Sequence, residues 1–74
     1  MTVDIELFGQ LADGKQKRQT LNLECPITVR EVAERLELNL ELIGLIAIDG
    51  VQRELEDTLP IDCRLCFFPP LSGG

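Results

Sequence analysis

Apolar and polar residues alternate along three stretches of the chain, as they do in β-strands with one buried face. These stretches run from Thr2 to Phe8, from Arg18 to Leu23 and from Cys63 to Phe68. Their inward positions are predicted to be Val3, Ile5, Leu7, Leu21, Leu23, Cys63, Leu65 and Phe67. A turn at Ala12–Lys15 separates the first two stretches, which predicts an antiparallel hairpin.

A different periodicity marks one helix. Its apolar positions recur every three or four residues, which predicts one stripe against the sheet: Val29, Val32, Ala33 and Leu36. Thr28 and Glu31 have the spacing of a capping box, which places the start of the helix in Pro26–Thr28. We expect the helix to end near Leu38–Asn39, because asparagine tolerates a left-handed cap.

Short elements are predicted between the helix and the last strand. Leu40–Leu45 is expected to form a short helical turn, and Ile46–Ile48 a short buried strand. Asp49-Gly50 is a strong hairpin-turn motif, so Val51–Arg53 should pair back on that strand. The apolar residues expected to fill the loop that follows are Leu55, Leu59 and Ile61.

This order of elements predicts an α+β chain with a β-grasp, ubiquitin-like roll. In such a roll a mixed sheet of about five strands packs on one main helix. The first and last strands are predicted to be parallel neighbours, because both are apolar enough to be central. We expect residues 1–68 to form the β-grasp domain and residues 69–74 to form a flexible C-terminal tail.

The same alternation places two aromatic residues on the outer face of the sheet, away from the helix. Phe8 and Phe68 end the first and last strands there, and Cys66 shares their face. An exposed apolar patch of this kind usually marks a partner site, and aromatic residues are enriched at interfaces. We therefore predict that these three residues dock a partner. The alternative is that the Gly9–Lys15 loop covers this face.

Composition narrows the classes of function. The 74 residues make one domain, and 45% of them are hydrophobic, which is enough for a packed core. The net charge of −6 argues against binding to nucleic acid or to anionic membranes. It suits partners with basic docking surfaces, or it serves solubility alone. The first residues lack the features of a secretory signal, and no stretch reaches the ~20 apolar residues of a membrane span, so we expect a cytoplasmic protein.

The chain has three cysteines, Cys25, Cys63 and Cys66, and an odd number fits a reducing compartment better than a disulfide scaffold. Cys63 and Cys66 form a Cys-x-x-Cys motif inside a predicted strand, where their side chains point to opposite faces. The sequence has no histidine and no second cysteine pair, so it predicts no metal site. A structural role explains the motif better than metal or redox chemistry.

The last residues, Leu71–Gly74, follow Pro69 and Pro70 and end in two glycines. Glycines lack Cβ atoms and fit narrow channels, whereas prolines project a stiff arm. The Gly74 carboxylate is therefore the candidate reactive group, and an inert chain end is the alternative. A carboxylate must be activated before it reacts, and this chain has no phosphate-binding glycine motif and no nucleophile–base pair. We expect a separate activating enzyme to use ATP, with no cofactor bound by this chain.

Three segments together resemble the molybdopterin synthase small subunit, in the MoaD/ThiS family of sulfur carriers. The segments are Leu7–Asp13, Thr28–Val32 and, most specifically, Phe67–Gly74 with its aromatic-aromatic-Pro-Pro stretch. The resemblance spans essentially the whole chain in length and element order. One stretch departs from it, because the family commonly has Gly-Asp-Glu where this chain has Asp62–Arg64.

The resemblance implies a sulfur-carrying subunit with no active site of its own. Gly74 would be adenylated by an E1-like adenylyltransferase and then converted to a thiocarboxylate with sulfur from a donor system. The charged tail would enter the large subunit of molybdopterin synthase and give its sulfur to the pyranopterin precursor in molybdenum cofactor biosynthesis. Gly73 would permit close passage through the channel. Leu71 and Ser72 would contact its wall, and the two prolines would set the exit direction.

Two other functions stay open on the sequence. The chain could carry sulfur for another pathway, such as thiazole formation for thiamine or a tungsten-linked paralogue's pathway. The departure at Asp62–Arg64 keeps that alternative open. It could also be a ubiquitin-like modifier, which is joined to a target lysine by an isopeptide bond.

Overall fold

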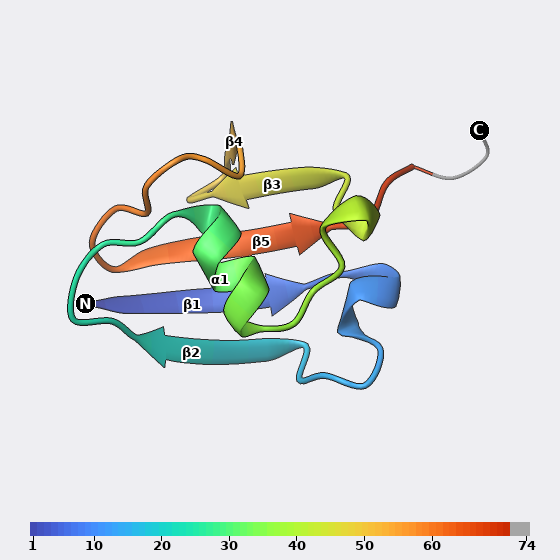
Figure 1. The fold of residues 1–74 in the computed structure, drawn as a ribbon, viewed down its shortest axis with the longest axis horizontal. Coiled ribbons are helices and arrows are strands. Elements are labelled where there is room, and N and C mark those ends of the chain that lie inside the picture. Colours follow the sequence, from blue (N-terminus) through green and yellow to red (C-terminus); the bar gives the residue numbers. More distant parts are fainter. Residues whose placement is uncertain (72–74) are drawn as a thin grey trace.

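The computed structural model describes residues 1–71, which form a mixed five-stranded sheet with one α-helix packed on one face (Figure 1). The strands are β1 (Thr2–Leu7), β2 (Arg18–Asn22), β3 (Leu45–Ile48), β4 (Val51–Arg53) and β5 (Cys63–Phe68). The helices are α1 (Val29–Arg35) and two short 3-10 helices, η1 (Gly9–Ala12) and η2 (Leu40–Leu42). This arrangement is the β-grasp, ubiquitin-like roll that the sequence predicts.

The strands lie in the order β2-β1-β5-β3-β4. β1 and β5 are parallel, whereas the other neighbours are antiparallel, so the predicted pairing of the first and last strands is confirmed. Parallel pairing places the starts of β1 and β5 at one end of the sheet and their ends at the other. The N-terminus and residues 69–71, which follow β5, therefore lie at opposite ends of the domain (Figure 1).

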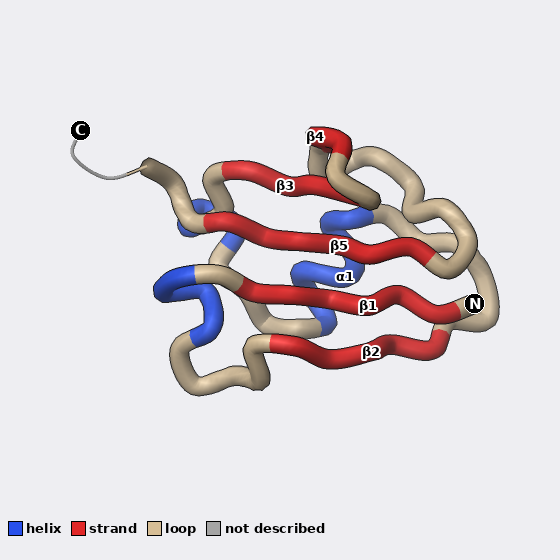
Figure 2. The backbone as a smooth tube through the Cα atoms, turned by 180° about the vertical axis from the view of Figure 1, so that it is seen from behind, coloured by secondary structure: helices blue, strands red, loops and turns tan. Residues whose placement is uncertain are grey.

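The core lies between α1 and the inner face of the sheet. Its inward strand positions alternate as predicted, and the residues with no more than 2% exposure include Val3, Ile5, Leu7, Val29, Val32, Leu65 and Phe67. The other face of the sheet carries no helix among the described residues (Figure 2). No helix of residues 1–71 has both the length and the apolar character that a membrane crossing requires.

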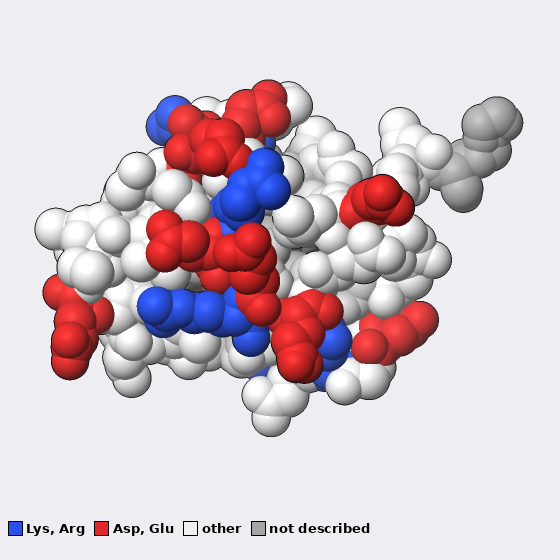
Figure 3. Space-filling view, viewed as in Figure 1, with Lys and Arg blue, Asp and Glu red and all other residues white. Residues whose placement is uncertain are grey.

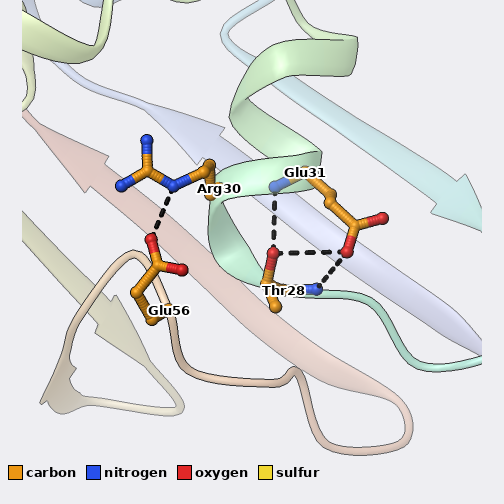
Figure 4. Close-up of polar contacts among 4 residues, drawn as sticks. All are labelled: Thr28, Arg30, Glu31 and Glu56. Carbon is orange, nitrogen blue, oxygen red and sulfur yellow. Dashed lines mark hydrogen bonds and ion pairs between the residues drawn. The ribbon is translucent and has the colours of Figure 1, made fainter.

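The predicted capping box starts α1. The Thr28 hydroxyl accepts a hydrogen bond from the Glu31 N–H at 3.2 Å, and the Glu31 carboxylate accepts from the Thr28 N–H at 3.5 Å (Figure 4). The loop after β4 fastens to the same turn, because the Arg30 N–H donates to the Leu55 carbonyl at 2.8 Å. The Arg30 guanidinium also pairs with the Glu56 carboxylate at 2.5 Å. Side-chain and backbone groups thus satisfy donors that a free helix start would leave unpaired.

The predicted helix end near Leu38–Asn39 is wrong, because α1 ends at Arg35. Glu37, with φ of 59°, takes the left-handed position that the sequence predicts for asparagine. The Leu38 N–H then donates to the Ala33 carbonyl at 3.0 Å, which closes a Schellman motif and turns the Leu38 side chain into the core. Burial of Leu38 thus ends the helix early. Asn39 instead caps η2, where its side chain accepts from the Glu41 N–H at 3.0 Å.

Two loops differ in part from the expectation. η1 was not expected before the turn at Ala12–Lys15, and it forms because Leu11 turns into the core, where it is 4% exposed. In the loop before β5, Leu59 is buried and Leu55 half-buried, but Ile61 is 72% exposed. Ile61 therefore does not fill that loop, because it sits on the solvent side of the tight turn that begins β5.

Candidate functional site at the root of the C-terminal arm

The C-terminal arm, defined here as Pro69–Leu71, leaves the sheet from the end of its central strand β5 (Figure 1). Pro69 is half-buried, Pro70 is exposed, and Leu71 is 100% exposed. The predictions for Ser72, Gly73 and Gly74 concern residues outside the described part of the chain, and they stay predictions. The described residues show what surrounds the base of the arm.

Phe8 and Phe68 stack at this base. Their ring centroids are 4.5 Å apart and their planes differ by 11°. The Lys17 ammonium lies 5.6 Å from the centroid of the Phe8 ring, a distance at which a cation and an aromatic face attract. Both rings are half-buried on the face of the sheet opposite α1, where the sequence placed them. Their role in docking a partner stays a prediction.

Leu45 extends the apolar surface beside the rings. It lies opposite Phe68 in the β3–β5 pairing and is 40% exposed. Gly44, Leu45, Phe68, Pro69 and Leu71 together line a largely apolar hollow. We call Phe8, Leu45, Phe68 and Leu71 the root patch. The sequence reading missed Leu45, although its position directly before the buried Ile46 puts it on the outer face by simple alternation.

A buried carboxylate, that of Glu6 in β1, lies on the same outer face of the sheet. The Glu6 side chain is only 6% exposed, because two arginines lie against it. The Arg64 guanidinium contacts one carboxylate oxygen at 2.5 Å and the Arg18 guanidinium the other at 3.4 Å. The hydrogen bond from Arg64 is the main cause that lowers the pKa of Glu6 below its ordinary value. The sequence reading missed this cluster because Glu6 alternates as a solvent-facing residue would.

The cysteines lie as the spacing predicts. Cys63 is buried in the core and Cys66 is half-buried on the outer face, so the two do not form a pair. Burial raises the pKa of the Cys63 thiol, which keeps it protonated and unreactive. Cys25 is exposed. Within residues 1–71, no group of acidic or cysteine side chains gathers in a way that could hold a metal ion.

The stretch Asp62–Arg64, at which the sequence departs from the resemblance, has a role inside the domain. Asp62 has a φ of 52°, a left-handed conformation that glycine adopts more easily. Its carboxylate accepts from the Thr2 N–H at 2.8 Å and from the Thr2 hydroxyl at 3.3 Å, and the first of these bonds lowers the pKa of Asp62. Asp62 thus ties the start of β5 to the start of β1. Cys63 fills the core and Arg64 pairs with Glu6.

The side of the molecule that α1 covers carries many charged groups. Figure 3 shows the side that α1 covers, where acidic groups predominate and basic groups lie among them. On α1 the exposed residues include Glu31, Glu34 and Arg35. Leu45 and the two rings of the root patch lie on the opposite face of the sheet. The face that bears the aromatic pair is thus not the face on which the helix charges lie.

The fold, with an exposed arm that continues from its central strand, defines a small ubiquitin-like β-grasp protein. No protein-family model matches the chain, and no curated protein matches its sequence. Solved structures do match it. SAMP1, a small archaeal modifier protein from Haloferax volcanii, has a TM-score of 0.74 and 20% identity, with 100% of both chains covered.

Two further similar structures belong to molybdopterin converting factors. Subunit 1 from Pyrococcus furiosus has a TM-score of 0.69 and 18% identity over 96% of this chain and 99% of that one. A chain in a complex of subunits 1 and 2 from Helicobacter pylori gives a TM-score of 0.64 and 19% identity. The match covers 100% of this chain and 100% of that one. These likenesses establish a shared fold, and the similar structures include subunit 1 of molybdopterin converting factors.

Proposed function

We propose that this chain is a sulfur-carrier protein, the small subunit of a molybdopterin synthase. The observation that carries the proposal is the stacked Phe8–Phe68 pair beside the base of an arm whose Leu71 is fully exposed. A partner that docks on the root patch would hold the domain while the arm reaches into its active site. The fold shared with subunit 1 of molybdopterin converting factors supports the same assignment.

The chemistry belongs to the C-terminal carboxylate of Gly74. A carboxylate oxygen attacks the α-phosphorus of ATP and releases pyrophosphate, which leaves an acyl adenylate. A persulfide sulfur from the donor system then displaces AMP, and reduction of the resulting acyl disulfide by two electrons from a thiol leaves the thiocarboxylate. Transfer to the pyranopterin precursor replaces the sulfur with a water oxygen and restores the carboxylate for another cycle. The chain itself supplies the acyl group and presents it to the partner enzymes.

Partners supply the remaining functions in this proposal. An E1-like adenylyltransferase binds ATP, a sulfur donor provides the persulfide, and the large subunit binds the precursor. The complex of subunits 1 and 2 from Helicobacter pylori supports a heteromeric assembly of this kind. The root patch is the surface that we assign to the large subunit.

Intact-mass measurement of the protein purified from its own cells tests the proposal. Replacement of one carboxylate oxygen by sulfur adds about 16 mass units, and treatment with a thiol-alkylating reagent should label the thiocarboxylate. A variant without Gly74 is the matched control and should gain nothing. Co-purification with a molybdopterin synthase large subunit would assign the pathway. A chain that never gains sulfur, even when its activating enzyme is co-expressed, would contradict the proposal.

A protein modifier is the second candidate, and the likeness to SAMP1 is the observation that favours it. A modifier would be recovered joined to other proteins through an isopeptide bond to lysine. The same mass measurement would then give large adducts in place of the small gain. A sulfur carrier of the thiazole or a tungsten-linked pathway would show the small gain but would co-purify with a different acceptor.

A further inference from the structure

Gly44 allows the backbone of the arm to lie directly against it. A Cβ atom built on Gly44 would lie 2.4 Å from the Pro70 Cα, 2.6 Å from the Pro70 nitrogen and 2.8 Å from the Pro69 carbonyl carbon. Carbon atoms in favourable contact are about 3.5–4.0 Å apart, so any side chain here would displace the arm. The neighbouring atoms are backbone atoms and cannot rotate away. Gly44 also has no left-handed φ, so the requirement for glycine comes from this contact alone.

Gly9 meets the arm from the other side. β1 and β3 flank β5, and Gly9 follows β1 while Gly44 precedes β3. A Cβ on Gly9 would lie 2.8 Å from Cγ of Pro69. The Gly44 N–H donates to the Phe68 carbonyl at 2.7 Å, and the Phe8 N–H donates to the Phe67 carbonyl at 3.1 Å. Hydrogen bonds thus fix the end of β5 on both sides up to the residue where the arm begins.

We infer that Gly44 and Gly9 are positioning residues that hold Pro69 and Pro70 and so set the direction in which the chain leaves the domain. The two prolines have fixed φ angles and no N–H groups, so contact with the two glycines leaves the arm few alternative directions. A partner that takes the end of the chain then loses less conformational freedom than it would with a free arm. The advantage for partner binding rests on the proposed function, but the contact between the two glycines and the two prolines does not.

NMR spectroscopy of the free protein tests the contact without any partner. The wild-type chain should give a strong nuclear Overhauser effect between the Gly44 and Pro70 α-protons. Gly44→Ala should lose this effect while the effects between Ile5 and Leu65, neighbours in the β1–β5 pairing, remain. Absence of the effect in the wild-type chain would overturn the inference, and so would its retention between residue 44 and Pro70 in Gly44→Ala with an otherwise unchanged spectrum.

Kinetics test the consequence. In ATP–pyrophosphate exchange by the cognate activating enzyme, Gly44→Ala should raise the KM for the carrier about three- to tenfold and leave kcat nearly unchanged, as loss of a pre-set conformation predicts. Pro70→Gly frees the same arm without adding an atom and should act in the same direction. It therefore decides the question if Gly44→Ala does not fold.

The matched control is Gly50→Ala. Gly50 has a φ of 83°, and a Cβ there would meet nothing within 4 Å, so the substitution strains a turn far from the arm. This variant should lose some stability and keep the wild-type KM. A KM that rises equally in Gly50→Ala, or that stays unchanged in both arm variants, would overturn the positioning role. Absence of exchange with the wild-type chain would instead reject the proposed function, and the NMR comparison would still decide whether the glycines hold the arm.

Discussion

Phe8 and Phe68 stack face to face because the first and last strands are parallel neighbours in register. Glu6 lies opposite Cys66 and Leu7 opposite Phe67, so Phe8, the residue after β1, meets Phe68, the last residue of β5. One ring of the pair therefore comes from the start of the chain and the other from its end. It forms only when β1 and β5 have paired, and it then sits at the base of the C-terminal arm.

Replacement of either ring should affect partner binding more than folding. A stacked pair contributes about 0.5–1.5 kcal/mol beyond its buried area, so Phe8→Ala and Phe68→Ala should each lower the free energy of unfolding modestly. Removal of a central aromatic at an interface costs about 2 kcal/mol or more of binding energy. Calorimetric titration with the large subunit should show this loss. Val51→Ala, an exposed apolar change on β4, is the control and should bind normally. Normal binding by both phenylalanine variants would reject the root patch as the docking surface.

Deletion of Gly74 should abolish charging and leave the fold intact. The described domain makes its core and its hydrogen bonds within residues 1–71, so the unfolding transition should not move. The truncated chain should show neither adenylation nor a gain of sulfur when it is incubated with the activating enzyme, ATP and the sulfur donor. Mass spectrometry and circular dichroism on the same sample measure both properties. Sulfur loading of the truncated chain would refute the assignment of the reactive group.

Glu6 should make the free energy of unfolding of the domain depend on pH. Its pKa is lower in the folded chain than the ordinary value of about 4.3, so the folded state favours the ionised carboxylate. The stabilisation is complete well above pH 4.3 and is lost as the pH falls through the folded-state pKa. Glu6→Gln should therefore be less stable than the wild-type chain at pH 7, and the difference should shrink in acid.

Urea unfolding at several pH values measures this difference. Arg64→Met is the companion variant, since it leaves Glu6 with Arg18 alone and should move acid unfolding to a higher pH. A stability difference between Glu6→Gln and the wild-type chain that stays constant from neutral to acidic pH would show that the arginines do not act through the charge of Glu6.

The capping box should contribute measurably to stability. Thr28→Ala removes the hydroxyl that accepts from the Glu31 N–H and should cost about 1 kcal/mol in the free energy of unfolding. Glu56→Gln is the control, because its ion pair with Arg30 is exposed and such pairs contribute about 0–1 kcal/mol. Thermal or urea unfolding compares the two. An effect of Thr28→Ala no larger than that of Glu56→Gln would contradict the capping role.

The sequence predicts those parts of this structure that depend on periodicity. Alternation along the first and last stretches places Phe8, Cys66 and Phe68 on the outer face, and the structure confirms that placement. The Thr28–Glu31 spacing identifies the helix start correctly. These patterns are local, so a residue's neighbours in the chain are enough to read them.

What the sequence does not predict depends on contacts between distant segments. The helix end at Arg35 follows from the burial of Leu38, and a local preference of asparagine for left-handed conformations could not reveal it. The burial of Glu6 requires Arg64 from the far end of the chain. The sequence likewise gives no sign that Gly44 differs from an ordinary loop glycine, because its requirement for glycine comes from Pro70, which lies against it in the folded chain.

The parallel pairing of β1 and β5 also determines how the domain bears force. A pull between the first residue and the C-terminal arm acts along both central strands in opposite directions. It loads their shared hydrogen bonds in shear, all at once, whereas a pull across a hairpin would open its bonds one after another. The domain should therefore stay folded while a partner pulls on the C-terminal arm.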